Sequence, residues 1–273
     1  MTTFVLVHGA WHGGWCWDRV APHLAAGGHR VVAPDLTGLG ARADLASPDT
    51  GLRRHVDDVV AVLDGLAAPV GEDPANGGGG APVGAAGDVV LVGHSYAGLV
   101  VHQAADRRPD LVDHLVLLDA WLASDRRSLF DQAPDWFVAW SRESADTAGD
   151  GWRIPPPPPA TVGVDDPADA AWLAARMVAQ PLATFAEPTR LTGAVRRVPT
   201  TAVVTWPGNG IDFASMAAAH DIAVRELASS HDSMVTDPAA LAEVLVGVRA
   251  RGSRARRPGA GSSPTCPSVC PSR

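Results

Sequence analysis

Ser95 is the residue whose type and surroundings best suit covalent chemistry. It stands in the stretch VVLVGHSYAG at residues 89–98, where an apolar run enters a Gly-x-Ser-x-small turn and leaves as a helix-like segment. Such a turn holds a serine side chain above a sheet, and its small residues let the strand and the helix pass closely. Ala97 takes the second small position, and Gly98 follows it. The pattern predicts a nucleophilic serine; the alternative is an ordinary Gly-Ser turn.

A serine nucleophile needs a base, and it needs a site for the negative charge that its attack creates. His231 lies in SSHDS, between the last apolar run and the closing helix-like segment. It is the base that we expect, and the alternative is a surface-loop histidine. Backbone N–H groups can hold the oxyanion. We expect them from Tyr96, which follows the serine, and from Ala10 in the Gly-rich loop after the first apolar run.

The segments that must position these residues alternate between strand-like and helix-like patterns. Short apolar runs typical of buried strands cover residues 3–7, 30–33, 88–92, 114–118, 201–205 and 222–227. Helical spacing or helix-stop signals mark residues 18–26, 52–66, 97–105 and 238–248. This alternation predicts an α/β fold in which helices cover both faces of a mostly parallel sheet.

Three stretches interrupt the alternation within and after a single domain expected at residues 1–250. Residues 121–197 contain five tryptophans and a run of prolines between two core strands, so we expect a helical cap outside the sheet. Residues 70–87 include four consecutive glycines and predict a flexible insertion. Residues 251–273 are rich in Arg, Pro, Gly and Ser and predict a disordered tail, because they offer little to bury.

Composition limits the partners of this 273-residue chain. A formal net charge of −8 disfavours an electrostatic nucleic-acid binder. No apolar run reaches the roughly 18 residues of a membrane span, and a first strand at Thr3 leaves no room for a signal peptide. We therefore expect a cytoplasmic protein without nucleic-acid or membrane partners, with a homodimer left open. The sequence has no metal-ligand constellation, phosphate loop or dinucleotide fingerprint, so we expect no metal and no cofactor.

Five stretches spread over most of residues 3–250 carry a family resemblance. They read FVLVHGAWHGGWCW, VVAPDLTGLG, LVGHSYAG, LVLLDAW and SSHDSM. Together they resemble the α/β-hydrolase superfamily, and within it the branch of plant-type methylesterases and hydroxynitrile lyases with their bacterial relatives. The resemblance implies the α/β-hydrolase fold. It also implies Ser95 as nucleophile, His231 as base, and the amides of Ala10 and Tyr96 as oxyanion hole.

The acid that orients the histidine is where the sequence departs from these relatives. They place an aspartate just after the strand that corresponds to residues 201–205, and the matching position here is Gly208. Asp119 ends the preceding core strand, and Asp212 comes four residues after Gly208. Both keep the chain order serine, acid, histidine. We favour Asp119, with Asp212 as the alternative acid and a triad without an acid as a third interpretation.

The lyase side of the resemblance fits poorly. Such lyases carry a lysine beside the catalytic histidine and a threonine in the oxyanion loop. Those positions are Asp232 and Gly9 in this chain. A negative charge beside His231 opposes an anionic leaving group, which argues against cyanohydrin cleavage.

Tryptophans near the expected site indicate what it binds. Trp11, Trp121, Trp136 and Trp140 are expected to line a pocket for a bulky apolar or aromatic small molecule. The alternative is that they only pack the cap onto the sheet. We expect a serine hydrolase that cleaves an ester of such a substrate. The alternatives are a non-hydrolytic cyclase or rearrangement enzyme of natural-product biosynthesis, and a ligand-binding protein with a degraded triad.

Overall fold

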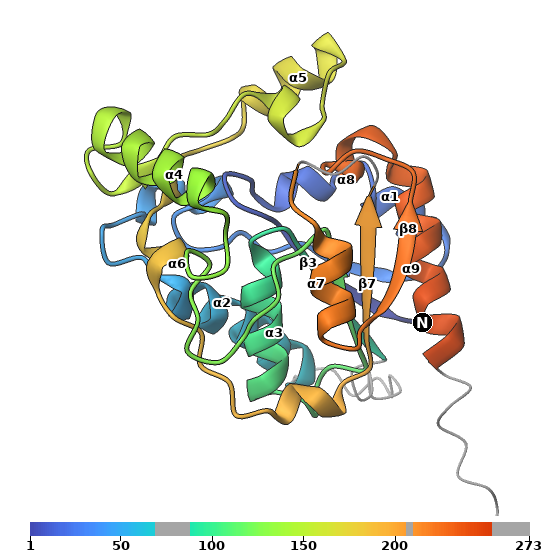
Figure 1. Ribbon diagram of the computed structural model, residues 1–273. Helices are drawn as coiled ribbons and strands as arrows, with labels where there is room; N and C mark the ends of the chain where they lie inside the picture. Colours follow the sequence, from blue (N-terminus) through green and yellow to red (C-terminus); the bar gives the residue numbers. More distant parts are fainter. Residues whose placement is uncertain (69–87, 206–209, 253–273) are drawn as a thin grey trace, which may run out of the picture.

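Six parallel strands form the central sheet (Figure 1). The computed structural model describes residues 1–68, 88–205 and 210–252. The strand order is β2-β1-β3-β4-β7-β8, and each neighbouring pair is parallel. The strands are β1 (Thr3–Val7), β2 (Arg30–Val32), β3 (Val89–His94), β4 (His114–Leu118), β7 (Thr200–Thr205) and β8 (Ala223–Leu227). The predicted α/β-hydrolase fold with a mostly parallel sheet is confirmed.

The central strands bury side chains on both faces of the sheet. In β1, Phe4 and Leu6 enter one apolar core, while Val5 and Val7 enter the other. Strands β3 and β4 alternate in the same way, and all of their side chains are buried. Burial on both faces explains why these strands appear in the sequence as continuous apolar runs.

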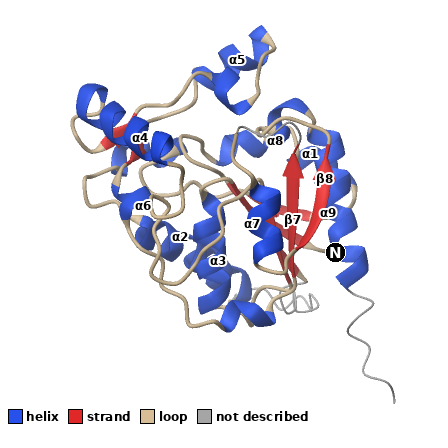
Figure 2. Cartoon of the chain, in the orientation of Figure 1, coloured by secondary structure: helices blue, strands red, loops and turns tan. Residues whose placement is uncertain are grey.

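Helices cover both faces of the sheet (Figure 2). On one face lie α2 (Leu52–Ala67), α3 (Ala97–Arg107) and α7 (Phe213–Ala219). On the other lie α1 (Ala21–Ala26), α8 (Ser233–Thr236) and α9 (Pro238–Gly252). Helix α1 begins three residues later than the sequence predicts, with Pro22 in its first turn, where its missing N–H costs nothing.

The chain between β4 and β7 lies outside the sheet. It contains α4 (Asp135–Ala148), α5 (Pro167–Ala174), α6 (Ala183–Ala186), and the antiparallel pair β5 (Arg153–Ile154) and β6 (Gln180–Pro181). In Figure 1, α4 and α5 lie on the side toward which the arrow of β7 points. This segment is the one expected as a cap at residues 121–197, and it covers the carboxyl ends of the strands. Turns of 3-10 helix occupy Gly14–Trp17, Gly40–Leu45, Pro159–Val162 and Ala194–Arg197.

Two predicted segments fall beyond what the structure describes. The expected insertion at residues 70–87 lies outside the described residues, as does the expected tail from residue 253 onward. Helix α9 continues to Gly252, two residues past the expected end of the domain. Within residues 1–68, 88–205 and 210–252, no helix is long and apolar enough to cross a membrane.

Two glycines allow the chain to pass closely around the turn after β3. A Cβ atom on Gly98 would lie 2.2 Å from the carbonyl oxygen of Trp121, and one on Gly93 would lie 2.5 Å from Cγ2 of Val101. Ala97 is fully buried at the second small position of the Gly-x-Ser-x-small turn. Helix α3 comes closest to the segment after β4 at Gly98, one residue later, so an alanine fits at position 97.

We expect Gly98→Ala to destabilise the protein, because its Cβ would overlap a backbone carbonyl that cannot move freely. Overpacking of this kind costs about 1–3 kcal/mol. Gly65→Ala is the matched control, since Gly65 is exposed in α2 with nothing within 4 Å of its added Cβ. Alanine should stabilise that helix by about 1 kcal/mol. Denaturant unfolding of both variants checks this, and a Gly98→Ala variant as stable as wild type would contradict the close approach.

Candidate active site

A cavity of about 270 Å³ opens beneath the cap. Eight of the residues expected in the site line it: Ala10, Trp11, Ser95, Tyr96, Trp121, Trp136, Trp140 and His231. The other lining residues are Leu129, Phe137, Pro157, Pro158, Thr161, Val162, Phe185 and Ile211. Among the described lining residues there is no Asp, Glu, Lys or Arg. The cavity wall is therefore mostly aromatic and apolar, and Ser95, Thr161 and His231 are among its polar residues.

Ser95 sits in a sharp turn with a backbone φ of +52°, a conformation rare for a residue with a side chain. Three hydrogen bonds hold it. Its N–H donates to the carbonyl of Leu118 at 3.0 Å, and its carbonyl accepts from Gly98 N at 3.0 Å and Trp121 N at 3.1 Å. Neighbouring backbone on both sides thus fixes a strained residue, as is common at functional sites.

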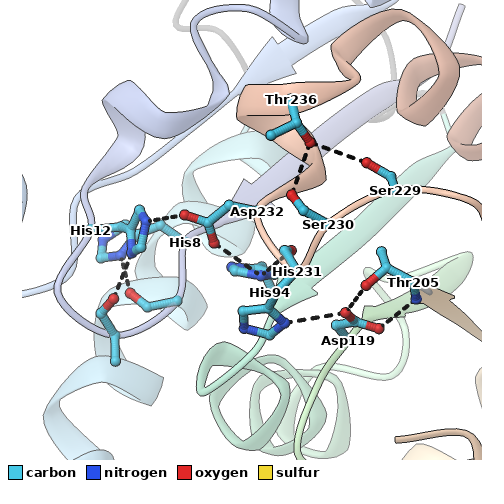
Figure 3. Close-up of polar contacts among 12 residues, drawn as sticks. His8, His12, His94, Asp119, Thr205, Ser229, Ser230, His231, Asp232 and Thr236 are labelled. Atoms are coloured by element: carbon cyan, nitrogen blue, oxygen red, sulfur yellow. Dashed lines mark hydrogen bonds and ion pairs between the residues drawn. The ribbon is translucent and has the colours of Figure 1, made fainter. Parts of the chain in front are cut away.

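Asp119 contacts the histidine ring. Its Oδ2 lies 3.2 Å from Nδ1 of His231, and its Oδ1 accepts from Thr205 N at 2.7 Å. The Thr205 hydroxyl donates to Oδ2 as well (Figure 3). Burial raises the pKa of the Asp119 carboxyl, but the hydrogen bond and the charge interaction with His231 and the two Thr205 donors outweigh it, so the pKa lies below its ordinary value. An ionised Asp119 accepts a hydrogen bond from the Nδ1–H of His231, which leaves Nε2 of the ring free to act as a base.

Strand order explains this meeting of residues distant in sequence. Asp119 follows β4, Thr205 ends β7, and His231 follows β8, and these three strands are neighbours in the sheet. Parallel strands end at one edge, so the three residues share it. Asp212 instead lies exposed at the start of α7, where it accepts from Ser215 N at 2.8 Å and caps the helix. The position that matches the acid of relatives, Gly208, lies outside the described residues.

Ser95 and His231 face the same cavity without a hydrogen bond between their side chains among the described residues. In unliganded sites such bonds are often long and tighten only with substrate. The His231 ring stacks on Phe213, with centroids 5.9 Å apart and an interplanar angle of 10°. Its carbonyl oxygen accepts from Nε2 of His94 at 3.1 Å. The ring and its backbone are therefore both held.

The amides of Ala10 and Tyr96 donate to no hydrogen bond within the described part of the chain. A Cβ atom on Gly9 would lie 3.1 Å from Cβ of Ser95 and 2.9 Å from Nδ1 of His94. The loop after β1 therefore reaches the serine because residue 9 has no side chain. Two unpaired N–H groups beside a serine can receive a negative oxygen.

Cap residues hold the loop that carries Ala10. Trp11 has a φ of +65°, its N–H donates to Oε1 of Gln180 at 3.1 Å, and its indole N–H donates to the carbonyl of Ile154 at 2.9 Å. These partners belong to β6 and β5 of the cap. The cap thus supports the loop beside the serine as well as covering the cavity.

A buried histidine fixes the side chain of Tyr96. Nε2 of His55 lies 2.8 Å from the carbonyl of Thr37, so it must donate, and Nδ1 then accepts from the Tyr96 hydroxyl at 2.9 Å. Burial lowers the pKa of His55 to about 4, which keeps the ring neutral. The Tyr96 hydroxyl is thereby held by His55.

Aromatic side chains that the sequence analysis did not select complete the wall. The Phe185 ring lies 6.1 Å from that of Trp11, 5.5 Å from Tyr96 and 5.9 Å from Phe137. Also missed from the sequence were Thr205, which donates to the Asp119 carboxylate, and Phe213, which stacks on the His231 ring. Thr205 could have been found, because it ends the strand next to the one that Asp119 follows.

A second polar cluster, formed by His12, His94 and Asp232, lies next to His231. Nε2 of His12 lies 2.9 Å from Oδ2 of Asp232, and Oδ1 of Asp232 lies 3.8 Å from Nε2 of His94. His94, His231 and Asp232 place ligand-type atoms within 4.8 Å of one another. Nδ1 of His231 and Nε2 of His94 already bond protein oxygens, and His94 Nδ1 is crowded against Gly9. These contacts link His12, Asp232, His94 and the His231 backbone into one polar network.

Comparisons with known proteins identify the family of this chain. The model of the alpha/beta hydrolase family matches residues 4–244. The chain is 33% identical over 258 residues to a carbendazim hydrolyzing esterase of Nocardioides sp. (strain SG-4G), which covers 90% of this chain and 98% of that protein. It is 35% identical over 126 residues to methylesterase 2 of Arabidopsis thaliana, covering 46% and 41% of the two chains. An extracellular alpha/beta-hydrolase from a Paenibacillus species superposes with a TM-score of 0.77 at 22% identity, over 91% of this chain and 99% of that one. The resemblance stated from the sequence is confirmed.

We expect stability to fall as the pH drops below neutrality. Burial lowers the pKa to about 3 for His8, about 4 for His55 and about 3 for His94, against an ordinary value of 6.5. Below about pH 6.5 these histidines are protonated in the unfolded chain but stay neutral in the folded one, so the free energy of unfolding decreases as the pH falls. Each such histidine contributes about 1.4 kcal/mol per pH unit. Denaturant unfolding at about pH 5, 6 and 7 measures this slope. His55→Gln should reduce the slope by one proton, and a slope unchanged in that variant would refute the assignment.

Proposed function

Because the chain belongs to the alpha/beta hydrolase family, we propose that it is a carboxylic ester hydrolase with Ser95 as nucleophile, His231 as general base and Asp119 as the acid. The contact of 3.2 Å between Asp119 Oδ2 and His231 Nδ1 carries this proposal. It supplies the carboxylate that a working histidine needs, next to a cavity whose wall contains the serine.

The chemistry follows from the tautomer that Asp119 imposes. With its Nδ1 proton held by the carboxylate, His231 takes the Ser95 hydroxyl proton at Nε2 as the oxygen attacks the ester carbonyl. The imidazolium then gives this proton to the leaving alcohol, and an acyl-serine remains. A water molecule, deprotonated by the same nitrogen, attacks the acyl-serine and releases the acid.

The tetrahedral intermediate places negative charge where two backbone donors converge. The amides of Ala10 and Tyr96 donate hydrogen bonds to the negatively charged oxygen. The loop does not have to move to do so, because Gly9 lies close to Ser95 and the hydrogen bonds of Trp11 already hold the loop in place. Stabilisation of this kind acts mainly on the transition state and raises kcat.

The substrate that the cavity suits is neutral, apolar and aromatic. About 270 Å³ admits a compact ring system with a small acyl or alkoxy group. The walls offer ring faces and edges to stack against. The similar protein of Nocardioides is a carbendazim hydrolyzing esterase, and the similar protein of Arabidopsis thaliana is a methylesterase. Carbendazim and methyl esters of aromatic acids are therefore the first substrates to test.

A glycine at position 208, where relatives carry the acid, and the aromatic cap favour a rearrangement enzyme as the alternative function. Asp119 supports hydrolysis instead, because it offers a carboxylate to His231 from the neighbouring strand. The other two functions become outcomes of the tests: conversion without hydrolysis, or binding without conversion.

We expect Ser95→Ala to abolish both labelling by a fluorophosphonate probe and ester turnover, with a loss in kcat of about 10⁶-fold. Asp119→Asn should lower kcat by about 10⁴-fold, because the wrong histidine tautomer is then favoured. The two are measured on purified protein by gel fluorescence and by steady-state hydrolysis of an aryl ester.

Asp212→Asn is the matched control for the acid. It removes the charge of the residue that caps α7, and because asparagine caps helices about as well as aspartate, both stability and kcat should stay close to wild type. Efficient labelling or turnover in the Ser95→Ala variant would show that Ser95 is not the nucleophile. If Asp212→Asn slowed the reaction and Asp119→Asn did not, the acid would be misassigned.

We expect neutral aryl esters to be hydrolysed with a kcat/KM at least about 10²-fold higher than analogues that carry a free carboxylate, since the walls offer no cation and desolvating an unpaired charge costs several kcal/mol. A nitro-substituted ester provides a neutral comparison of nearly the same size. Equal kcat/KM values for the carboxylate and the nitro compounds would show that the substrate does not enter this cavity.

A further inference from the structure

The imidazole of His12 lies between two hydrogen-bond acceptors (Figure 3). Its Nδ1 is 2.6 Å from the carbonyl oxygen of Ala10, and its Nε2 is 2.9 Å from Oδ2 of Asp232. A carbonyl oxygen can only accept, so Nδ1 carries a proton. An ionised carboxylate also only accepts, so Nε2 carries a second one. The geometry therefore fits an imidazolium paired with a carboxylate.

The surroundings support charge on both partners. His12 is 2% exposed and Asp232 is fully buried. Burial lowers the pKa of His12, but the charge of Asp232 and the hydrogen bonds to Asp232 and Ala10 outweigh it and raise the pKa above its ordinary value. Burial raises the pKa of Asp232, and the charge and hydrogen bond of His12 lower it further than burial raises it. Each partner keeps the other ionised.

The titratable groups that face this pair are His8, Cys16, His94 and His231. Burial lowers the pKa of the histidines at positions 8 and 94 to about 3 and raises that of the cysteine thiol. These three groups are therefore neutral near pH 7. Among the described residues in this cluster, the His12 cation is what balances Asp232.

The pair joins two loops whose contacting residues are 220 positions apart in sequence. His12 belongs to the loop after β1, two residues beyond Ala10, and Asp232 directly follows His231. The backbone N–H of Asp232 also donates to the carbonyl of Val162 in the cap, at 3.2 Å. One residue thus contacts the loop after β1 through its side chain and the cap through its backbone.

The peptide group between Ala10 and Trp11 is hydrogen-bonded through both its carbonyl oxygen and its N–H. His12 donates to its carbonyl oxygen at 2.6 Å, and its N–H donates to Gln180 at 3.1 Å. Fixing this peptide sets the direction of the preceding one, which carries the N–H of Ala10. A donor aimed at an oxyanion loses most of its effect when it is displaced by about 1 Å.

We propose that the His12–Asp232 ion pair positions the oxyanion loop relative to the loop that carries His231. The inference rests on the proposed hydrolytic function. Neither side chain lines the cavity, so neither touches substrate, and both are positioning residues that act through Ala10 and His231.

We expect Asp232→Asn and His12→Gln each to lower kcat by about 10-fold to 10²-fold, the range for a displaced oxyanion donor, with KM nearly unchanged. Asparagine keeps the shape of the side chain but removes the charge, so His12 becomes neutral and can donate to only one of its two acceptors. A trifluoromethyl ketone analogue of the ester forms a hemiketal oxyanion with Ser95. Its affinity should fall by the same factor as kcat/KM, while the affinity of the product acid should not change.

Two controls separate positioning from general loss of stability. Asp169→Asn removes the carboxylate of a partly exposed ion pair with Arg19, whose atoms lie 2.6 Å apart, and should leave kcat unchanged. The double variant His12→Gln/Asp232→Asn should be no slower than the slower single variant, because the two residues act as one unit.

Long-range ¹H–¹⁵N correlation spectra of the wild-type protein test the ion pair directly and require no variant to fold. His12 should show two protonated ring nitrogens near pH 7. A neutral His12 ring overturns the inference, as does an Asp232→Asn variant with wild-type kcat and inhibitor affinity. If wild-type protein hydrolyses no ester and Ser95 is not labelled, the proposed function fails, and the spectrum still decides whether the ion pair exists.

Discussion

The turn at Ser95 is the constraint on which the rest of the structure depends. A residue with a side chain is held at a φ of +52° because its N–H and carbonyl bond the backbone after β4 and within the turn. Gly93 lets β3 pass close to Val101 of α3, and Gly98 lets α3 pass close to the backbone of Trp121 after β4. The same hydrogen bonds bring Leu118, and therefore Asp119, level with the serine.

Parallel strands then assemble the remaining groups. Since every strand of the sheet ends at one edge, the loops after β1, β3, β4 and β8 meet there, and the cap between β4 and β7 closes over them. The cap does more than cover. Through Gln180 and Ile154 it anchors Trp11, and through Val162 it holds the backbone of Asp232. The segment that covers the cavity therefore also holds the loops that carry Ala10 and His231.

Burial sorts the histidines of this region into two states. His8, His55 and His94 are neutral near pH 7 because desolvation by burial outweighs the groups that favour their charged form. His12 is kept charged because Asp232 lies against it in the same dry interior. The neutral rings act as fixed donors and acceptors for backbone groups, and the charged one donates from both nitrogens. The site thus gains rigid polar contacts from rings that carry no charge.

The sequence by itself determined the strands, the helices around them, the serine turn, the histidine and the aromatic lining, because each depends on local spacing or on a continuous motif. It left the acid open between Asp119 and Asp212, since that choice depends on which strands are neighbours. It read Asp232 only as a charge beside His231 and His12 only as part of a motif. Only the tertiary structure placed Asp119 against His231 and paired His12 with Asp232, because hydrogen bonds between loops 112 and 220 residues apart leave no local pattern.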